Sequence, residues 1–259
     1  MSLTSVTIIS PEAANGRNVV ALGVTKAFAA VGKTMVFRPA VCSKDTFTDV
    51  LLGSANAGLS REQCAGVCPK QARNDKSAAR ADIVAAYNQA VESAHPEFAV
   101  IVGTDKSSVN DPAMFAFNAD VAADLKSPVL LAVCTIGRTP EQVRETVEAS
   151  SRTIEDAGSA VVGVFVTGCD DGQIDPLKAC FEDYPVPVWM LPAVDFEDDD
   201  AIAEAAEVFA ANVDATELLV AVQAPFEVPT TPYAFQYSLL GKAKAHKKTI
   251  VLPEGAEDR

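Results

Sequence analysis

The chain has few basic residues for its length. Its 259 residues include 21 Lys and Arg against 35 Asp and Glu, which gives a formal net charge of −14. Nucleic acids and anionic membranes bind to clustered positive charge, so this composition argues against both as partners. The sequence also lacks an apolar run of about 18–20 residues, the length that spans a bilayer, and it lacks the features of a secretory signal. We therefore expect a cytoplasmic protein.

Histidine is scarcer still. The chain has two histidines, His95 and His246, and neither stands in a pattern typical of a nucleophile–His–carboxylate set. A closed zinc site needs four ligands, which the sequence does not group together. Cys64 and Cys68 are four residues apart and would face the same way on a helix, as metal ligands or a redox pair would. Two ordinary thiols are the alternative, and we predict no metal site.

The remaining composition is that of a globular protein, with 49% hydrophobic and 22% charged residues. Short runs that are apolar throughout indicate strands with both faces covered, and they are expected at residues 6–10, 34–38, 98–103, 128–134, 160–168 and 186–191. Helical patterns separate them, at residues 17–31, 75–95, 111–125, 139–158 and 198–213. This order predicts an α/β fold with a parallel sheet of about six or seven strands, flanked by helices on both faces.

Some local signals add detail to this prediction. Thr139, Pro140 and Gln142 form the start of a helix with a capping box. Pro39 is expected to end the second strand. Residues 42–74 are polar, contain glycine and include some helical fragments, and we interpret them as an excursion over the top of the sheet, where α/β proteins build ligand sites.

The loop after the first strand lies where nucleotide-binding proteins have a phosphate loop, Gly-x-x-x-x-Gly-Lys-Ser/Thr. Here Glu12, Arg17 and Asn18 stand for the first glycine, the lysine and the hydroxyl residue, and only Gly16 is retained. A carboxylate at residue 12 would repel a triphosphate. The free N–H groups of the following helix would still bind a weaker anion. The alternative is an ordinary β–α turn without a ligand.

Basic residues follow several strands. Parallel strands place their carboxyl ends at one edge of the sheet, and the basic residues expected there are Arg17, Arg38, Lys106 and Arg138. Solvated loop charges would look the same in the sequence. We predict an anion or effector site, without a metal, formed by Asn15, Gly16, Arg17, Asn18 and Arg38.

The last residues carry a family resemblance. Thr231–Phe235 and then Lys247–Arg259, which reads Lys-Lys-Thr-Ile-Val-Leu-Pro-Glu-Gly-Ala-Glu-Asp-Arg, resemble the opening of the catalytic domain of a phosphate acetyltransferase. The preceding residues resemble, more weakly, the N-terminal domain of the long members of that family. That domain is similar to the P-loop ligase dethiobiotin synthetase.

This chain departs from the ligase-like pattern at three places. The lysine of the phosphate loop is absent, the acidic residue after the third strand is replaced by Gly103 with Asp105 two places on, and the asparagine that ends the fifth strand is replaced near Thr167 and Gly168. The resemblance therefore implies a P-loop-NTPase-like fold, similar to dethiobiotin synthetase, with a degenerate phosphate loop that no longer supports phosphoryl transfer.

The resemblance also implies a domain order. Residues 1–222 would form the dethiobiotin-synthetase-like domain, residues 223–232 a Pro-rich linker, and residues 233–259 the first helix and strand of a catalytic domain. The parent reaction would interconvert acetyl-CoA plus phosphate with acetyl phosphate plus CoA. The family's catalytic residues lie further on, so none is expected in this chain, and no cofactor either; CoA and acetyl-CoA would be substrates of the parent enzyme.

The expected role is regulation and assembly, with the chain's own catalytic domain, a small anionic effector and further copies of the chain as partners. Two alternatives stay open from the sequence. One is an active ATP-dependent ligase of the dethiobiotin synthetase type, in which Arg17 and Asp105 would replace the missing groups. The other is an oligomerisation module without a ligand.

Overall fold

The computed structural model describes residues 3–12, 16–104, 112–194 and 199–224. Their seven strands form one parallel sheet in the order β3-β2-β4-β1-β5-β6-β7. The strands are β1 (Thr4–Ile9), β2 (Thr34–Ala40), β3 (Ala65–Val67), β4 (Phe98–Val102), β5 (Val129–Cys134), β6 (Val161–Cys169) and β7 (Val188–Pro192). The predicted α/β fold with a parallel sheet is confirmed. The linker from residue 225 onward and the tail at 233–259 lie outside the described residues.

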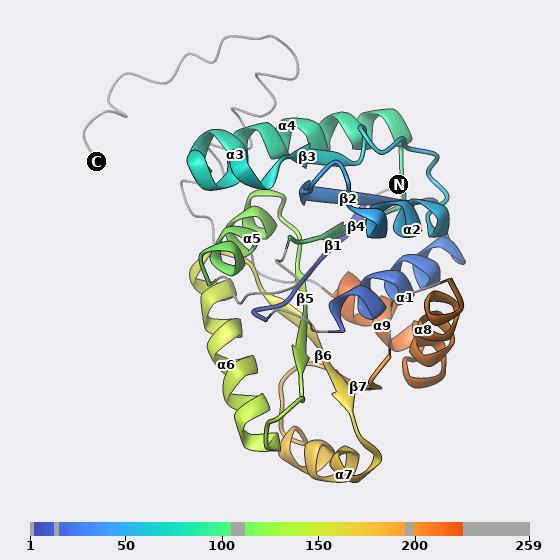
Figure 1. Ribbon diagram of the computed structural model, residues 1–259, viewed down its shortest axis with the longest axis vertical. Coiled ribbons are helices and arrows are strands. Elements are labelled where there is room, and N and C mark those ends of the chain that lie inside the picture. Colours follow the sequence, from blue (N-terminus) through green and yellow to red (C-terminus); the bar gives the residue numbers. More distant parts are fainter. Residues whose placement is uncertain (1–2, 13–15, 105–111, 195–198, 225–259) are drawn as a thin grey trace, which may run out of the picture.

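Helices cover both faces of the sheet (Figure 1). The first face carries α1 (Arg17–Ala29), α2 (Thr46–Ser54), α8 (Asp199–Asn212) and α9 (Ala215–Gln223). The second face carries α3 (Pro69–Asn74), α4 (Lys76–Ala94), α5 (Pro112–Asp124), α6 (Pro140–Asp156) and α7 (Asp171–Cys180). The core is therefore divided by the sheet into two apolar layers.

Strand β5 explains why the strand sequences are apolar throughout. Its side chains alternate between the two faces, as the pleat of a strand requires. Leu130 and Ala132 pack in the layer of α1, whereas Val129, Leu131 and Val133 pack in the layer of α6. All five residues are fully buried, so a polar side chain at any of these positions would lose its hydrogen bonds to water and destabilise the fold.

The local predictions have different outcomes. Thr139 and Gln142 form the reciprocal capping box at the start of α6, as predicted. The expectation that Pro39 ends the second strand is wrong, because β2 continues to Ala40. Residues 42–74 contain helical segments, as expected, in α2 and α3, but they also contain the edge strand β3, which was not expected. Strand β3 pairs with β2 through Ala65 and Val67.

Candidate functional site

The degenerate phosphate loop connects the end of β1 to the start of α1, at the carboxyl edge of the sheet. Asn15 and the two residues before it lie outside the described part of the chain. Gly16 is the N-cap of α1 and packs tightly against β6, since a Cβ at residue 16 would lie 2.6 Å from the Cβ of Thr167. The glycine is therefore explained by close packing of the helix start on the sheet.

Glu12 is a buried carboxylate in this loop, with 7% of its side chain exposed. Its Oε2 accepts a hydrogen bond from the backbone N–H of Cys134, 2.8 Å away, and its Oε1 forms an ion pair with Arg138. The alignment of Glu12 with the motif's first glycine is wrong by one residue, because the position five residues before Gly16 is Pro11. The carboxylate joins the loop to the end of β5, so this edge of the sheet already contains an internal anion.

Arg17 turns inward from the first turn of α1 and is only 4% exposed. Its Nη1 donates to the carbonyl oxygen of Gly103 at 2.6 Å, and its Nη2 donates to Oδ1 of Asn18 at 2.9 Å. A P-loop lysine reaches towards a phosphate, whereas this guanidinium bonds to the backbone just after β4. Arg17 therefore connects the start of α1 to the carboxyl end of β4.

Arg38, in β2, is 3% exposed and has a separate set of neighbours. Its Nη1 lies 3.3 Å from Oδ2 of Asp45, the N-cap residue of α2, and its guanidinium lies 5.7 Å from the centre of the Phe47 ring. These contacts are made with other residues than the Gly103 carbonyl and Asn18 side chain that Arg17 contacts. Lys106, the fourth basic residue considered at this edge, lies outside the described residues.

The two cysteines with helical spacing do not lie on one helix. Cys64 is buried before β3, and Cys68 is the exposed N-cap residue of α3, with the strand between them. Burial raises the pKa of Cys64 to about 11. In the part of the chain that the structure describes, no group of three or more His, Cys, Asp or Glu residues is placed to hold a metal ion.

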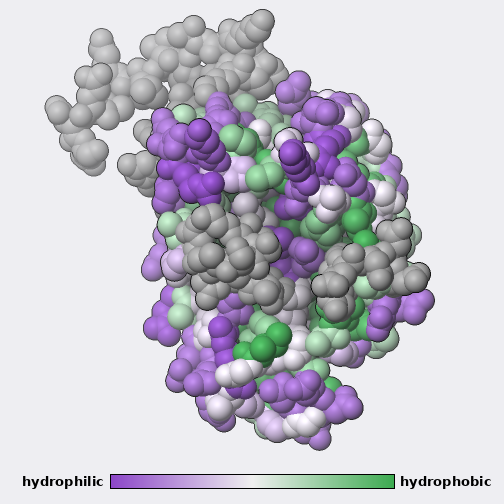
Figure 2. All heavy atoms as spheres, in the orientation of Figure 1, coloured by the Kyte–Doolittle hydropathy of each residue, from purple (hydrophilic) through white to green (hydrophobic). Residues whose placement is uncertain are grey.

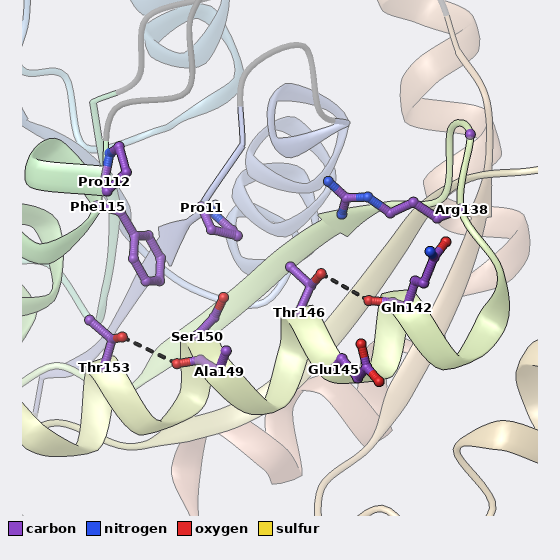
Figure 3. A pocket seen from close by; sticks show the side chains of 11 residues that line it. Pro11, Pro112, Phe115, Arg138, Gln142, Glu145, Thr146, Ala149, Ser150 and Thr153 are labelled. Atoms are coloured by element: carbon purple, nitrogen blue, oxygen red, sulfur yellow. Dashed lines mark hydrogen bonds between the residues drawn. The ribbon is translucent and has the colours of Figure 1, made fainter.

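A groove of about 630 Å³ adjoins Arg138 and was not anticipated from the sequence. Its floor is one side of α6, and Pro11, Pro112 and Phe115 form the opposite wall (Figure 3). The α6 residues that line it are Gln142, Glu145, Thr146, Ala149, Ser150 and Thr153. A signal exists in the sequence, because these small and polar residues recur at helical spacing along one side of the helix.

The surface around these features is mostly hydrophilic, and its apolar areas are small and separate (Figure 2). Within the described residues, the large apolar side chains with high exposure are Val31, Ile136 and Val220. None of the described helices combines the length and apolar character needed to cross a membrane.

Several solved structures are similar in fold. An ATP complex of McdA from Cyanothece has 12% identity, a TM-score of 0.44, and coverage of 96% of this chain and 98% of its own. A plasmid partition protein from Borrelia burgdorferi B31 bound to AMPPNP has 10% identity and a TM-score of 0.49, and the match covers 82% of this chain and 99% of the other. Cobyrinic acid a,c-diamide synthase from Mycobacterium smegmatis has 14% identity and a TM-score of 0.45, and the match covers 89% of this chain and 99% of the other.

The family comparison extends over most of the described chain. Residues 4–189, from β1 into β7, match the family described as an AAA domain. The parallel sheet, the helix that follows β1 and the loop at its start agree with a P-loop-NTPase-like fold. By this match the chain belongs to the AAA domain family.

Proposed function

We propose that this domain no longer transfers phosphoryl groups and acts as the regulatory and assembly part of a phosphate acetyltransferase. The observation that carries the first half is the position of Glu12. Its carboxylate accepts from the Cys134 N–H and pairs with Arg138 beside the loop that would otherwise receive a phosphate. An anion held there by the protein itself competes with a nucleotide for the same donors and repels its charge.

The second half depends on the resemblance of the last residues to a phosphate acetyltransferase. These residues, 231–259, lie outside the described part of the chain, so their support comes from sequence alone. In this proposal the catalytic residues follow the tail, and the domain contributes a docking surface for its own catalytic domain and for further copies of the chain. Acetyl-CoA and CoA are substrates of that catalytic domain.

The loss of phosphoryl transfer is tested by calorimetry with ATP, in the presence and absence of Mg²⁺. We expect no tight, Mg²⁺-dependent binding by the 259-residue chain. Glu12→Gln removes the internal charge and is expected to create weak binding of inorganic phosphate beside Arg138. The matched control is Glu141→Gln, which removes an exposed carboxylate from the start of α6. Tight Mg²⁺-dependent ATP binding by the unaltered chain would overturn the proposal.

Tight Mg²⁺-dependent ATP binding would support the second candidate function, an ATP-dependent enzyme, which membership of the AAA domain family favours.

The proposed role in a phosphate acetyltransferase needs a separate assay. A protein that carries this chain together with a complete acetyltransferase catalytic domain is expected to form acetyl phosphate from acetyl-CoA and phosphate, whereas the 259-residue chain alone is not. Absence of this activity in the protein with both parts, or its presence in the chain alone, would refute that role while leaving the nucleotide result unaffected.

A further inference from the structure

Arg138 lines the groove along α6. Within the described residues, its acceptors are Oε1 of Glu12 and the carbonyl oxygen of Cys134, and both receive bonds from Nη1. The buried carboxylate therefore orients the guanidinium and leaves its Nε and Nη2 for other partners. The side chain is 30% exposed, and its guanidinium extends along the groove towards Pro11 (Figure 3).

Ser150 adds a second polar group to the same groove. The residue is 5% exposed, yet it lines the groove, and its hydroxyl points into it (Figure 3). The described residues provide no hydrogen-bond partner for this hydroxyl. The hydroxyls of Thr146 and Thr153 on the same side of the helix donate to helix carbonyls. The Ser150 hydroxyl does not, so it can bond to a ligand in the groove.

We propose that this groove binds a small organic carboxylate. The planar Nε–Nη2 edge of a guanidinium matches the two oxygens of a carboxylate in a bidentate pair. Glu145 also lines the groove and disfavours ligands with two or more negative charges, which separates a monocarboxylate from a phosphate ester. The rings of Pro11 and Phe115 face α6 and provide an apolar wall for the body of the ligand.

Size and polarity narrow the ligand further. A groove of about 630 Å³ lies within the range of roughly 300–1,000 Å³ that is typical of small-molecule sites. A ligand held by its carboxylate at Arg138 passes the apolar wall before it reaches Ser150, so a hydroxyl or carbonyl group at its far end would satisfy the serine. The expected ligand is therefore an elongated monocarboxylate with a second polar group.

The test is a calorimetric and NMR titration of the 259-residue chain with linear monocarboxylates of increasing length, and with the same series carrying a terminal hydroxyl. Alcohols of equal length and inorganic phosphate are the ligand controls. We expect saturable binding of the carboxylates that strengthens about two- to fourfold per methylene, weak or no binding of the alcohols and of phosphate, and tighter binding of the hydroxylated series.

Three variants and two controls identify the site. Arg138→Gln is expected to weaken binding about tenfold to a hundredfold, and Ser150→Ala to remove the advantage of the hydroxylated series. Glu145→Gln is expected to tighten binding about two- to fivefold and to admit phosphate. The controls are Arg152→Gln and Ser151→Ala on the same helix; Arg152 does not line the groove, and the Ser151 hydroxyl contacts Tyr184 instead.

No saturable binding by the unaltered chain would overturn the proposal. Equal losses in Arg138→Gln and Arg152→Gln would also overturn it, as would an unchanged affinity in Glu145→Gln. If Arg138→Gln fails to fold, the Ser150→Ala and Glu145→Gln variants still decide the outcome, because their expected effects have opposite signs. None of these results depends on ATP binding or on acetyl phosphate formation, so failure here is distinguishable from failure of the proposed function.

Discussion

The ring of Phe209 in α8 lies directly against the backbone of Gly23 in α1. A Cβ at residue 23 would lie 2.0 Å from Cγ of the ring, a separation that real side chains do not adopt. Phe209 is 3% exposed and also contacts the ring of Phe165 at 5.7 Å between centroids. The ring is therefore held between a helix and the sheet and has little room to move.

Gly23→Ala is accordingly expected to destabilise the protein by about 1–3 kcal/mol, the usual cost of overpacking a core. Helix propensity alone would favour alanine by about 1 kcal/mol, so the sign of the change separates the two effects. Gly53→Ala in α2 is the control, because nothing lies within 4 Å of the added Cβ and a small gain in stability is expected. Urea unfolding of both variants gives the free energies. A stabilised Gly23→Ala variant would contradict the close contact between Gly23 and Phe209.

Asp124 gives the protein a component of stability that depends on pH. The carboxyl group is buried at the end of α5 and pairs with Arg80 of α4, with Nε 2.6 Å from Oδ2. Burial raises its pKa to about 6 despite this partner. Because the folded state holds the proton more tightly, the contribution of this group is largest below its ordinary pKa of 3.8 and is lost as the pH rises through about 6.

The comparison of the unaltered chain with Asp124→Asn isolates this effect. Between pH 7 and pH 5 the unaltered chain is expected to gain about 1 kcal/mol relative to the variant, which cannot titrate at that position. Urea unfolding at several pH values measures the difference. A constant difference across this range would show that Arg80 keeps the carboxyl group ionised throughout.

Arg17→Ala is expected to destabilise the protein by about 1.5–3 kcal/mol, the range for hydrogen bonds to a charged group. The reason is that the buried guanidinium joins the start of α1 to the Gly103 carbonyl. Arg17→Lys keeps the charge but loses the second donor nitrogen. Its free energy of unfolding should therefore lie between those of the unaltered chain and Arg17→Ala. Thermal and urea unfolding test this order. Unchanged stability of Arg17→Ala would contradict a stabilising role for the bond to the Gly103 carbonyl.

The cysteines are expected to react at very different rates. Cys42 and Cys68 are exposed, whereas Cys64 and Cys169 are buried, and burial raises the pKa of each of the latter two to about 11. The thiolate is the reacting form, so at about pH 8 iodoacetamide should modify the exposed pair at least about a hundredfold faster. Timed alkylation with peptide mapping provides the rates. Rapid loss of the Cys64 thiol in folded protein would contradict its burial.

The sheet could be predicted from the sequence because its strands are continuous apolar runs with helix signals between them, of which the Thr139 capping box is one example. Strand β3 has only three residues and contains Gly66, so it carries no run to detect. Helix α7 was missed for a related reason: Pro176 lies inside it, and only Leu177 of its residues is fully buried. Strand β3 forms by pairing with β2, which no local pattern reports, whereas α7 does carry a local signal, the capping box of Asp170 and Gln173 at its start.

The basic residues near the carboxyl ends of the strands could be predicted from the sequence, but neither their bonding partners nor the groove along α6 could. The sequence placed basic residues at the carboxyl ends of the strands, and Arg17, Arg38 and Arg138 are found there. It could not show that Arg17 bonds to a carbonyl oxygen, because that acceptor is the backbone of Gly103, just after β4 and 86 residues away in the chain. Nor could it pair Glu12 with Arg138, which are separated by 126 residues.

The strand order has a consequence for how the protein is made. Strand β1 emerges first during synthesis, yet its two neighbours in the sheet are β4 and β5, which end at Val102 and Cys134. A nascent chain shorter than this exposes the apolar sides and both hydrogen-bonding edges of β1, and such edges invite pairing with other chains. Strands β5, β6 and β7, by contrast, join the sheet in the order of translation. Ribosome-bound chains arrested before residue 134 should therefore recruit chaperones, and those arrested later should release them.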